Sequence, residues 1–293
     1  MRKHVFRESL AVFLLTLMGG AVSSLAARAA EPLSKADTAQ LQELGTKTFG
    51  IKWTGAVHAG QERGVVAVTD GTTTLTRRGL RTFIINDKKR VTDDSKMFAG
   101  SDDELKKRGT RILEATGVKA SEILEARVLL QTTQSSYLAP GAAAKTEGPQ
   151  KGRRTLLVTR QVGGIHVPSS RFVLNLDASG RIAFMELTWP ELSKETLAAA
   201  QRIRDAQREM KPPAVEAATV ESAQPVVLHS PAVGFFDDQV AALQVVYRPD
   251  RPETGKKPVR YLGIDGKEVT LPRQLELPRE EKIERKSPAK PQS

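Results

Sequence analysis

Apolar and polar residues alternate with a period of two through most of the central part of the chain. This spacing is typical of β-strands with one buried face, because successive side chains of a strand point to opposite faces. Turn signals such as Asp70-Gly71 and the segment 177–180 separate successive runs, which favours antiparallel hairpins. The predicted strands are 65–69, 72–76, 80–85, 124–130, 155–162, 171–176, 182–187, 226–228, 241–247, 259–262 and 269–271.

Helical spacing predicts shorter segments between these strands. The clearest begins at Ser101, where the serine hydroxyl can accept the amide N–H of Glu104 while the Glu104 carboxylate reaches back to Ser101. Apolar residues then share one helical face, and Gly117 suits the left-handed end of the helix. Two more helices are predicted at 34–44 and 193–210.

A helix followed by several strands occurs twice in this order. The order predicts an α+β fold in which antiparallel sheets are each covered by a helix, with two helix-then-strands units in tandem as one arrangement. The small, polar segment 139–152 is predicted to be a mobile hairpin loop. The predicted divisions are a signal peptide at 1–29, a helix with β-hairpins at 30–100, a helix plus antiparallel sheet at 101–190, a second helix plus antiparallel strands at 191–276, and a disordered tail at 277–293.

The first residues have the pattern of a secretory signal peptide. Arg2, Lys3 and Arg7 form a positive region, and an apolar run follows at 10–26. Ala27-Arg28-Ala29 places small residues where a signal peptidase cleaves, so we expect cleavage after Ala29 and a periplasmic or secreted location. A retained membrane anchor is the alternative, although Gly19-Gly20 interrupts the apolar run and shortens it below a spanning length.

The stretch 101–192 resembles a known secreted module. The resembling parts are the helix that ends in LEATGV, the strand TLLVTRQVGGIHV and the hairpin RFVLNLDASGRIAFMELTW. Together they are similar to the PepSY type of module found in propeptides of thermolysin-like proteases, with Gly164–Val167 and Asp177–Gly180 at its turns. The sequence has no His-Glu-x-x-His protease motif. The resemblance therefore implies a non-catalytic, protein-binding or regulatory module.

Composition excludes several kinds of chemistry. The 293 residues include no cysteine, which excludes disulfides, thiolate metal sites and a cysteine nucleophile. The mature chain would keep three histidines, His58, His166 and His229, and none has a partner at helical metal-ligand spacing. We therefore expect no cofactor, no metal and no enzymatic activity. A hydrolase with an unrecognised site remains an alternative, and it would need His166 or His229 to meet acidic residues in a pocket.

Charge and apolar faces indicate what the chain could bind. The formal net charge of the whole chain is +11, and loss of residues 1–29 removes four basic residues and one acidic residue, which leaves +8. Aromatic residues are scarce, at 5%, which disfavours a nucleic-acid groove. The candidate anion contacts are Arg77, Arg78, Arg81, Lys88, Lys89 and Arg90. The candidate interaction surface on the central hairpin is Phe172, Leu174, Phe184, Met185 and Trp189, although packing in the core explains the same pattern.

Three functions follow from these observations. The first is an exported, non-catalytic interaction or regulatory module of the bacterial cell envelope, inhibitor- or chaperone-like towards an envelope enzyme. The second is a basic protein that binds anionic envelope polymers, since a positive net charge favours anionic partners. The third is the hydrolase. The expected partner in the first case is another envelope protein, and no stable membrane span is expected after cleavage.

Overall fold

The computed structural model describes residues 35–62, 65–79, 81–91, 98–137, 145–230, 238–250 and 257–272. The predicted signal peptide 1–29 and the predicted tail 277–293 lie outside the described residues. The elements in chain order are α2 (Lys35–Lys47), β1 (His58–Glu62), β2 (Val65–Thr69), β3 (Thr73–Gly79), β4 (Thr82–Asp87), α3 (Lys88–Val91), α4 (Asp102–Ala115), the 3-10 turn η1 (Ala120–Glu122), β5 (Ile123–Tyr137), β6 (Lys145–Val162), β7 (Ile165–Leu176), β8 (Ile182–Thr188), α5 (Lys194–Ala206), β9 (Ala218–His229), β10 (Gln239–Pro249) and β11 (Val259–Leu262).

The strands form one sheet. Its described strands number 11, in the order β1-β2-β3-β4-β8-β7-β9-β10-β11, with β5 and β6 branching from β7. All pairings are antiparallel except that of β7 with β9, which is parallel through His166 and Val226. The prediction of separate antiparallel sheets, each covered by a helix, is therefore wrong, although the fold is still α+β. Strands β1–β8 and strands β9–β11 join in one sheet because β7 is long enough to pair with strands of both groups.

A bulge in β7 explains how this strand serves two sets of neighbours. Thr159 of β6 pairs with Arg171, but the next residue, Arg160, pairs with Val167. Residues 168–170 are therefore extra on the β7 side, and a bulge of this kind bends a strand. Pro168 fits this position because proline has no N–H to give to a ladder. β6 pairs with β7 on both sides of the bulge, whereas the other edge of β7 meets β9 before the bulge and pairs with β8 after it.

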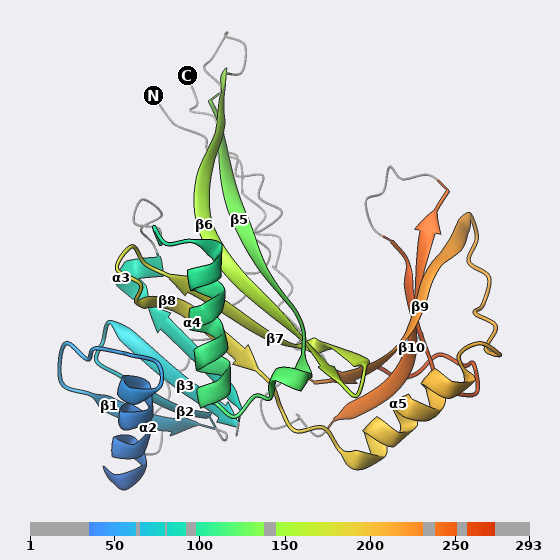
Figure 1. Cartoon of the computed structure of the whole chain (residues 1–293), viewed down its shortest axis with the longest axis horizontal. Helices are drawn as coiled ribbons and strands as arrows, with labels where there is room; N and C mark the ends of the chain where they lie inside the picture. The colour runs from blue at the N-terminus through green and yellow to red at the C-terminus, as the bar shows by residue number, and fades with distance from the viewer. Residues whose placement is uncertain are drawn as a thin grey trace, which may run out of the picture.

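The N-terminal lobe consists of β1–β8 with α2 and α4 lying over one face of its sheet (Figure 1). Its core includes Leu105 and Ile112 of α4, Leu75 of β3 and Phe172 of β7, all buried. The predicted capping box is present: Ser101 Oγ accepts the Glu104 N–H, and Glu104 accepts from the Ser101 N–H at 2.7 Å. The left-handed conformation predicted at Gly117 is also present, with φ +81°.

The C-terminal lobe consists of α5 and β9–β11, to the right in Figure 1. Ser193 Oγ accepts the Thr196 N–H and so caps the start of α5. Ile203 of α5 packs with Leu243 and Tyr247 of β10 and with Leu262 of β11. A separate cluster joins the lobes, since Ile165 and Val167 of β7 pack with Ala200 of α5 and Val227 of β9.

Of the predicted loop 139–152, residues 139–144 lie outside the described residues, and the remainder is strand rather than loop. Residues 145–152 belong to β6, which continues the hairpin with β5 past Thr132, and Tyr137 still pairs with Lys145. Backbone hydrogen bonding between antiparallel strands does not need apolar side chains, so small and polar residues can extend it. The hairpin projects away from the rest of the sheet as a two-stranded arm (Figure 1).

A substitution at Gly109 tests how closely α4 packs on the sheet. A Cβ added there would overlap Leu156 Cδ2 and lie 3.2 Å from Phe172 Cε1. Alanine normally favours a helix over glycine by about 1 kcal/mol. We expect the opposite for Gly109→Ala: a loss of about 1–3 kcal/mol in the free energy of unfolding, because the core must move. Thr110→Ala, on the exposed side of α4, is the control and should change stability little; urea denaturation measures both. A more stable Gly109→Ala chain would contradict this packing.

Candidate functional site

The outer edge of β5 is the most open feature of the N-terminal lobe. Within the described residues β5 pairs only with β6, so its other edge has no strand beside it. Leu124, Leu129 and Leu130 on this strand keep 46%, 45% and 48% of their surface exposed. They are three of the seven large apolar side chains that are exposed in the described part of the chain. Apolar side chains and unpaired backbone therefore occur together on one strand.

Part of this edge is regular. Residues 125–130 pair with β6 residue by residue, from Glu125 with Thr159 to Leu130 with Arg154. Register shifts lie on both sides of this run, before Glu125 and after Leu130. Glu125 and Arg127 form an exposed ion pair at 3.2 Å on the same side of the strand. A straight run of six residues is therefore available, which is about the length of an ordinary strand.

The candidate interaction surface on the central hairpin lies in the core. Phe172, Leu174, Met185 and Trp189 are fully buried. Phe184 alone of the five is partly exposed, on the opposite face of β8 from Met185. The buried four pack with α4 and with β3 and β4 in the N-terminal lobe. They are not accessible to a partner while the chain is folded.

The candidate anion contacts do not form one group. Arg77 and Arg78 of β3, with Arg81, lie near the start of β4, since Arg77 pairs with Phe83. Lys88, Lys89 and the backbone of Arg90 lie in α3 at the other end of β4. Arg81 lies 3.8 Å from Glu122, and burial lowers the pKa of Arg78, with Glu186 acting in the opposite direction.

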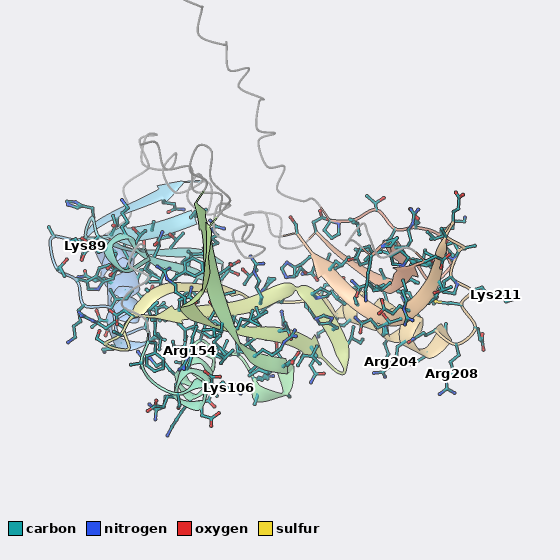
Figure 2. All side chains as sticks on the ribbon, turned by 90° about the horizontal axis from the view of Figure 1, so that it is seen from above. Lys89, Lys106, Arg154, Arg204, Arg208 and Lys211 are labelled. Carbon is teal, nitrogen blue, oxygen red and sulfur yellow. The ribbon has the colours of Figure 1, made fainter. Side chains whose placement is uncertain are left out.

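Other cations are spread over both lobes. Figure 2 places Lys89, Lys106 and Arg154 on the N-terminal lobe, and Arg204, Arg208 and Lys211 on the C-terminal lobe. Some of these groups already bind the protein itself: Arg154 donates to the Gly100 carbonyl and Arg204 donates to the Gly163 carbonyl. The six labelled cations therefore belong to two lobes rather than to one group.

A buried arginine connects the elements around the bend of β7. Arg160 of β6 donates to Glu122 of η1, with Nη2 at 2.8 Å and Nε at 3.1 Å from the carboxylate. Its Nη1 donates to the Pro190 carbonyl at 2.7 Å, and the guanidinium lies 5.3 Å from the centre of the Trp189 ring. Trp189 Nε1 also donates to Glu122, at 2.9 Å. The charge of Arg160 is therefore paired, and each of its three nitrogens has an acceptor nearby, as a buried charge requires.

A serine–histidine pair lies next to Arg160. Ser170 Oγ lies 2.9 Å from His229 Nε2, and His229 Nδ1 lies 3.0 Å from the Ser230 carbonyl. The carbonyl can only accept, so Nδ1 carries the proton and Nε2 accepts from the serine hydroxyl. Burial lowers the pKa of His229; the hydrogen bond to Ser230 opposes this shift and the charge of Arg160 adds to it.

The separation of Ser170 Oγ and His229 Nε2 would suit a nucleophile and its general base, but the environment of the pair does not suit catalysis. Ser170 and His229 are each only 1% exposed, so a substrate cannot reach the hydroxyl. The carboxylate nearest in this network, Glu122, binds Arg160 and Trp189 rather than His229. His166 lies on β7 and does not join the pair. The geometry fits a structural hydrogen bond that ties β7 to β9.

In the part of the chain that the structure describes, no group of three or more His, Cys, Asp or Glu side chains is arranged to hold a metal ion. None of the helices in these segments combines the length and the apolar character needed to cross a membrane.

The sequence of β5 differs from simple alternation in a way that points to its exposed leucines. Leu124 and Leu130 belong to the apolar side of the predicted half-buried strand, whereas Leu129 lies on the other side. Large apolar residues on both faces are unusual for an antiparallel strand with one face in water. The Ser170–His229 pair had no such signal, because the two residues are 59 positions apart.

Glu122 provides a test of the network around Arg160. Glu122→Gln keeps the size of the side chain but leaves the Arg160 charge buried without a counterion. We expect the free energy of unfolding to fall by about 3–5 kcal/mol. Glu125→Gln is the matched control, because its ion pair with Arg127 is exposed and should contribute less than about 1 kcal/mol. Urea denaturation distinguishes them, and equal effects would contradict the role assigned to Arg160.

The lowered pKa of His229 predicts a dependence of stability on pH. The unfolded chain binds a proton at His229 near the ordinary pKa of 6.5, whereas the folded chain binds it only at lower pH. The free energy of unfolding should therefore fall as pH drops below about 6.5. Burial lowers the pKa of His166 too, so its effect has the same sign.

Thermal unfolding between pH 7.5 and 5 measures this effect. His229→Asn should reduce the loss of stability on acidification, even if it lowers stability at every pH. His166→Asn should remove a separate part of the same slope. An unchanged slope in His229→Asn would show that this histidine is not held neutral by the fold.

Comparisons with known proteins give two distant likenesses. No family model matches the chain, and no curated protein matches it. The crystal structure of an uncharacterized protein from Eubacterium rectale ATCC 33656 is similar with a TM-score of 0.45 and 12% identity, over 83% of this chain and 84% of that one. The YpeB C-terminal domain of Bacillus megaterium is similar with a TM-score of 0.35 and 9% identity, over 82% of this chain and 96% of that one. At these TM-scores neither likeness carries an argument about fold or function.

Proposed function

We propose that this chain is an exported, non-catalytic interaction module of the bacterial cell envelope that binds an extended segment of a partner protein along the edge of β5. The observation that carries the proposal is the open edge of β5 with Leu124, Leu129 and Leu130 exposed on it. Export follows from the signal-peptide pattern of residues 1–29, and the resemblance of 101–192 to PepSY modules supports a regulatory role.

Open strand edges attract other strands, so proteins usually protect them. Typical protection is a short edge strand, a proline, or charged side chains. β5 has 15 residues, none of them proline or glycine, and its charges between 125 and 130 neutralise each other. An added strand would gain backbone hydrogen bonds along this run, and the leucines would select apolar residues in it. Covering a segment of an envelope enzyme in this way would give an inhibitor- or chaperone-like effect.

The other functions have less support. A hydrolase would need an accessible nucleophile, and the Ser170–His229 pair is buried. A polymer-binding protein would need its cations on one surface, and the labelled cations of Figure 2 are divided between the lobes.

The test compares two surfaces of equal exposure. Leu129→Asp/Leu130→Asp changes the β5 edge, whereas Val220→Asp changes β9 at a residue that is also 48% exposed. Each immobilised chain is incubated with the envelope fraction of the cells that produce it. We expect the unchanged chain and Val220→Asp to retain the same protein, and the β5 variant to retain at least tenfold less, because two carboxylates replace the apolar contact.

Hydrogen exchange then locates the contact. The retained protein is purified and returned to the chain, and exchange of amides 125–130 should become slower, since edge amides gain hydrogen-bond partners. Retention unchanged by the β5 variant, or slower exchange only outside β5, would overturn the proposal. Sedimentation distinguishes a second copy of this chain: a dimer that the β5 variant abolishes would replace the partner protein with self-association.

A further inference from the structure

A pocket separate from the β5 edge lies on the helix-covered face of the sheet. Its volume is about 650 Å³, within the range of about 300–1,000 Å³ that is usual for small-molecule sites. We call it the Arg77 pocket. Its lining residues are Leu44, Gln61, Val66, Arg77, Gly79, Phe83, Ala115 and Thr116.

Strand register explains the floor of the Arg77 pocket. Gln61 of β1 pairs with Val66 of β2, Val66 pairs with Arg77 of β3, and Arg77 pairs with Phe83 of β4. Directly opposed residues point to the same face of a sheet, so these four side chains form one row across four strands. α2 and α4 lie apart over this face (Figure 1), and Leu44 of α2 and the C-terminal end of α4 form the walls.

The pocket combines an apolar lining with one cation. Leu44, Val66, Phe83 and Ala115 supply apolar surface. Among the described residues, the side chains of Arg77 and Gln61 form no hydrogen bond or ion pair. Thr116 is already used, because its hydroxyl donates to the carbonyls of Ile112 and Leu113. The free polar groups of the pocket are therefore two donors on the floor, one of them charged.

The end of α4 does not cancel this positive charge. A helix C-terminus carries a partial negative charge from its last carbonyl groups. Here the carbonyls of Ile112, Leu113 and Glu114 accept hydrogen bonds from the N–H groups of Thr116, Gly117 and Val118 and from the Thr116 hydroxyl. Arg77 consequently remains available to an anion from outside the chain.

We infer that the Arg77 pocket binds an apolar monocarboxylate, such as a medium-chain fatty acid. Its hydrocarbon part lies against Leu44, Val66, Phe83 and Ala115, and its carboxylate pairs with Arg77. A guanidinium matches a carboxylate through two parallel N–H donors, and the Gln61 amide provides a further donor. One cation matches one negative charge, whereas a phosphate monoester would bring close to two.

Isothermal titration calorimetry with dodecanoate, below its micelle concentration, tests the inference. The unchanged chain should bind about one equivalent, and butanoate should bind at least tenfold more weakly because it buries less apolar surface. Arg77→Met keeps much of the side-chain volume without the charge and should weaken dodecanoate binding about tenfold or more. Arg127→Met, which removes a half-exposed arginine from β5, is the matched control and should bind normally.

Two further measurements test the contribution of the Arg77 charge and that of the pocket volume separately. Dodecan-1-ol, which has the chain without the charge, should bind weakly to the unchanged chain and equally weakly to Arg77→Met. Ala115→Phe, at an exposed position of α4, should block binding by filling the pocket, with circular dichroism confirming an intact fold. Leu129→Asp/Leu130→Asp should not affect dodecanoate, which keeps this test independent of the β5 proposal. Absence of saturable binding, or normal binding by Arg77→Met, would overturn the inference.

Discussion

The bend of β7 at residues 168–170 is the constraint on which the arrangement of the chain depends. β6 stays beside β7 throughout, but on the other edge β7 meets β9 before the bend and pairs with β8 after it. A strand that changes neighbours leaves backbone and side-chain polar groups at the change, and these need partners. Ser169 accepts the His229 N–H, Ser170 bonds to the His229 ring, and Arg160 fills the remaining space with Glu122. The polar network is therefore a consequence of one sheet serving two lobes.

Local patterns predicted most of the elements because local physics determines them. Alternation identified most of the strands, although it missed β1 and predicted a strand at 269–271 that the structure does not contain. The Ser101–Glu104 spacing identified a capping box whose two hydrogen bonds are both present. The single sheet could not be predicted in the same way. It depends on one parallel contact between His166 and Val226, 60 residues apart, and on a bulge at Pro168 whose effect depends on β6. Neither leaves a periodic signal in the sequence.

For the candidate site residues too, closeness along the sequence does not predict which side chains share a surface. Basic residues that are close in sequence, such as Arg78 and Lys88, lie towards opposite ends of β4. Arg77 and Arg78 are adjacent and point to opposite faces, so only Arg77 lines the pocket, while Arg78 lies near Glu186 on the other face. Basic residues that are clustered along the sequence therefore do not form one charged surface in the fold. On the central hairpin, Phe172, Leu174, Met185 and Trp189 are buried in one core with residues of α4, and a covered apolar face is a core.

The two proposed sites lie on different strands of the N-terminal lobe, β1–β4 and β5, yet one short stretch of chain connects them. α4 ends at Ala115 in the wall of the Arg77 pocket, η1 supplies Glu122 to the network around Arg160, and β5 begins at Ile123. Glu122 is held by three different groups, Arg160, Trp189 and Arg81. A rigid connection of this kind resists independent movement of α4 and β5, because either movement would expose or unpair the buried Arg160 charge. The network that joins the two lobes thus also determines how the pocket wall and the open strand edge are placed relative to each other.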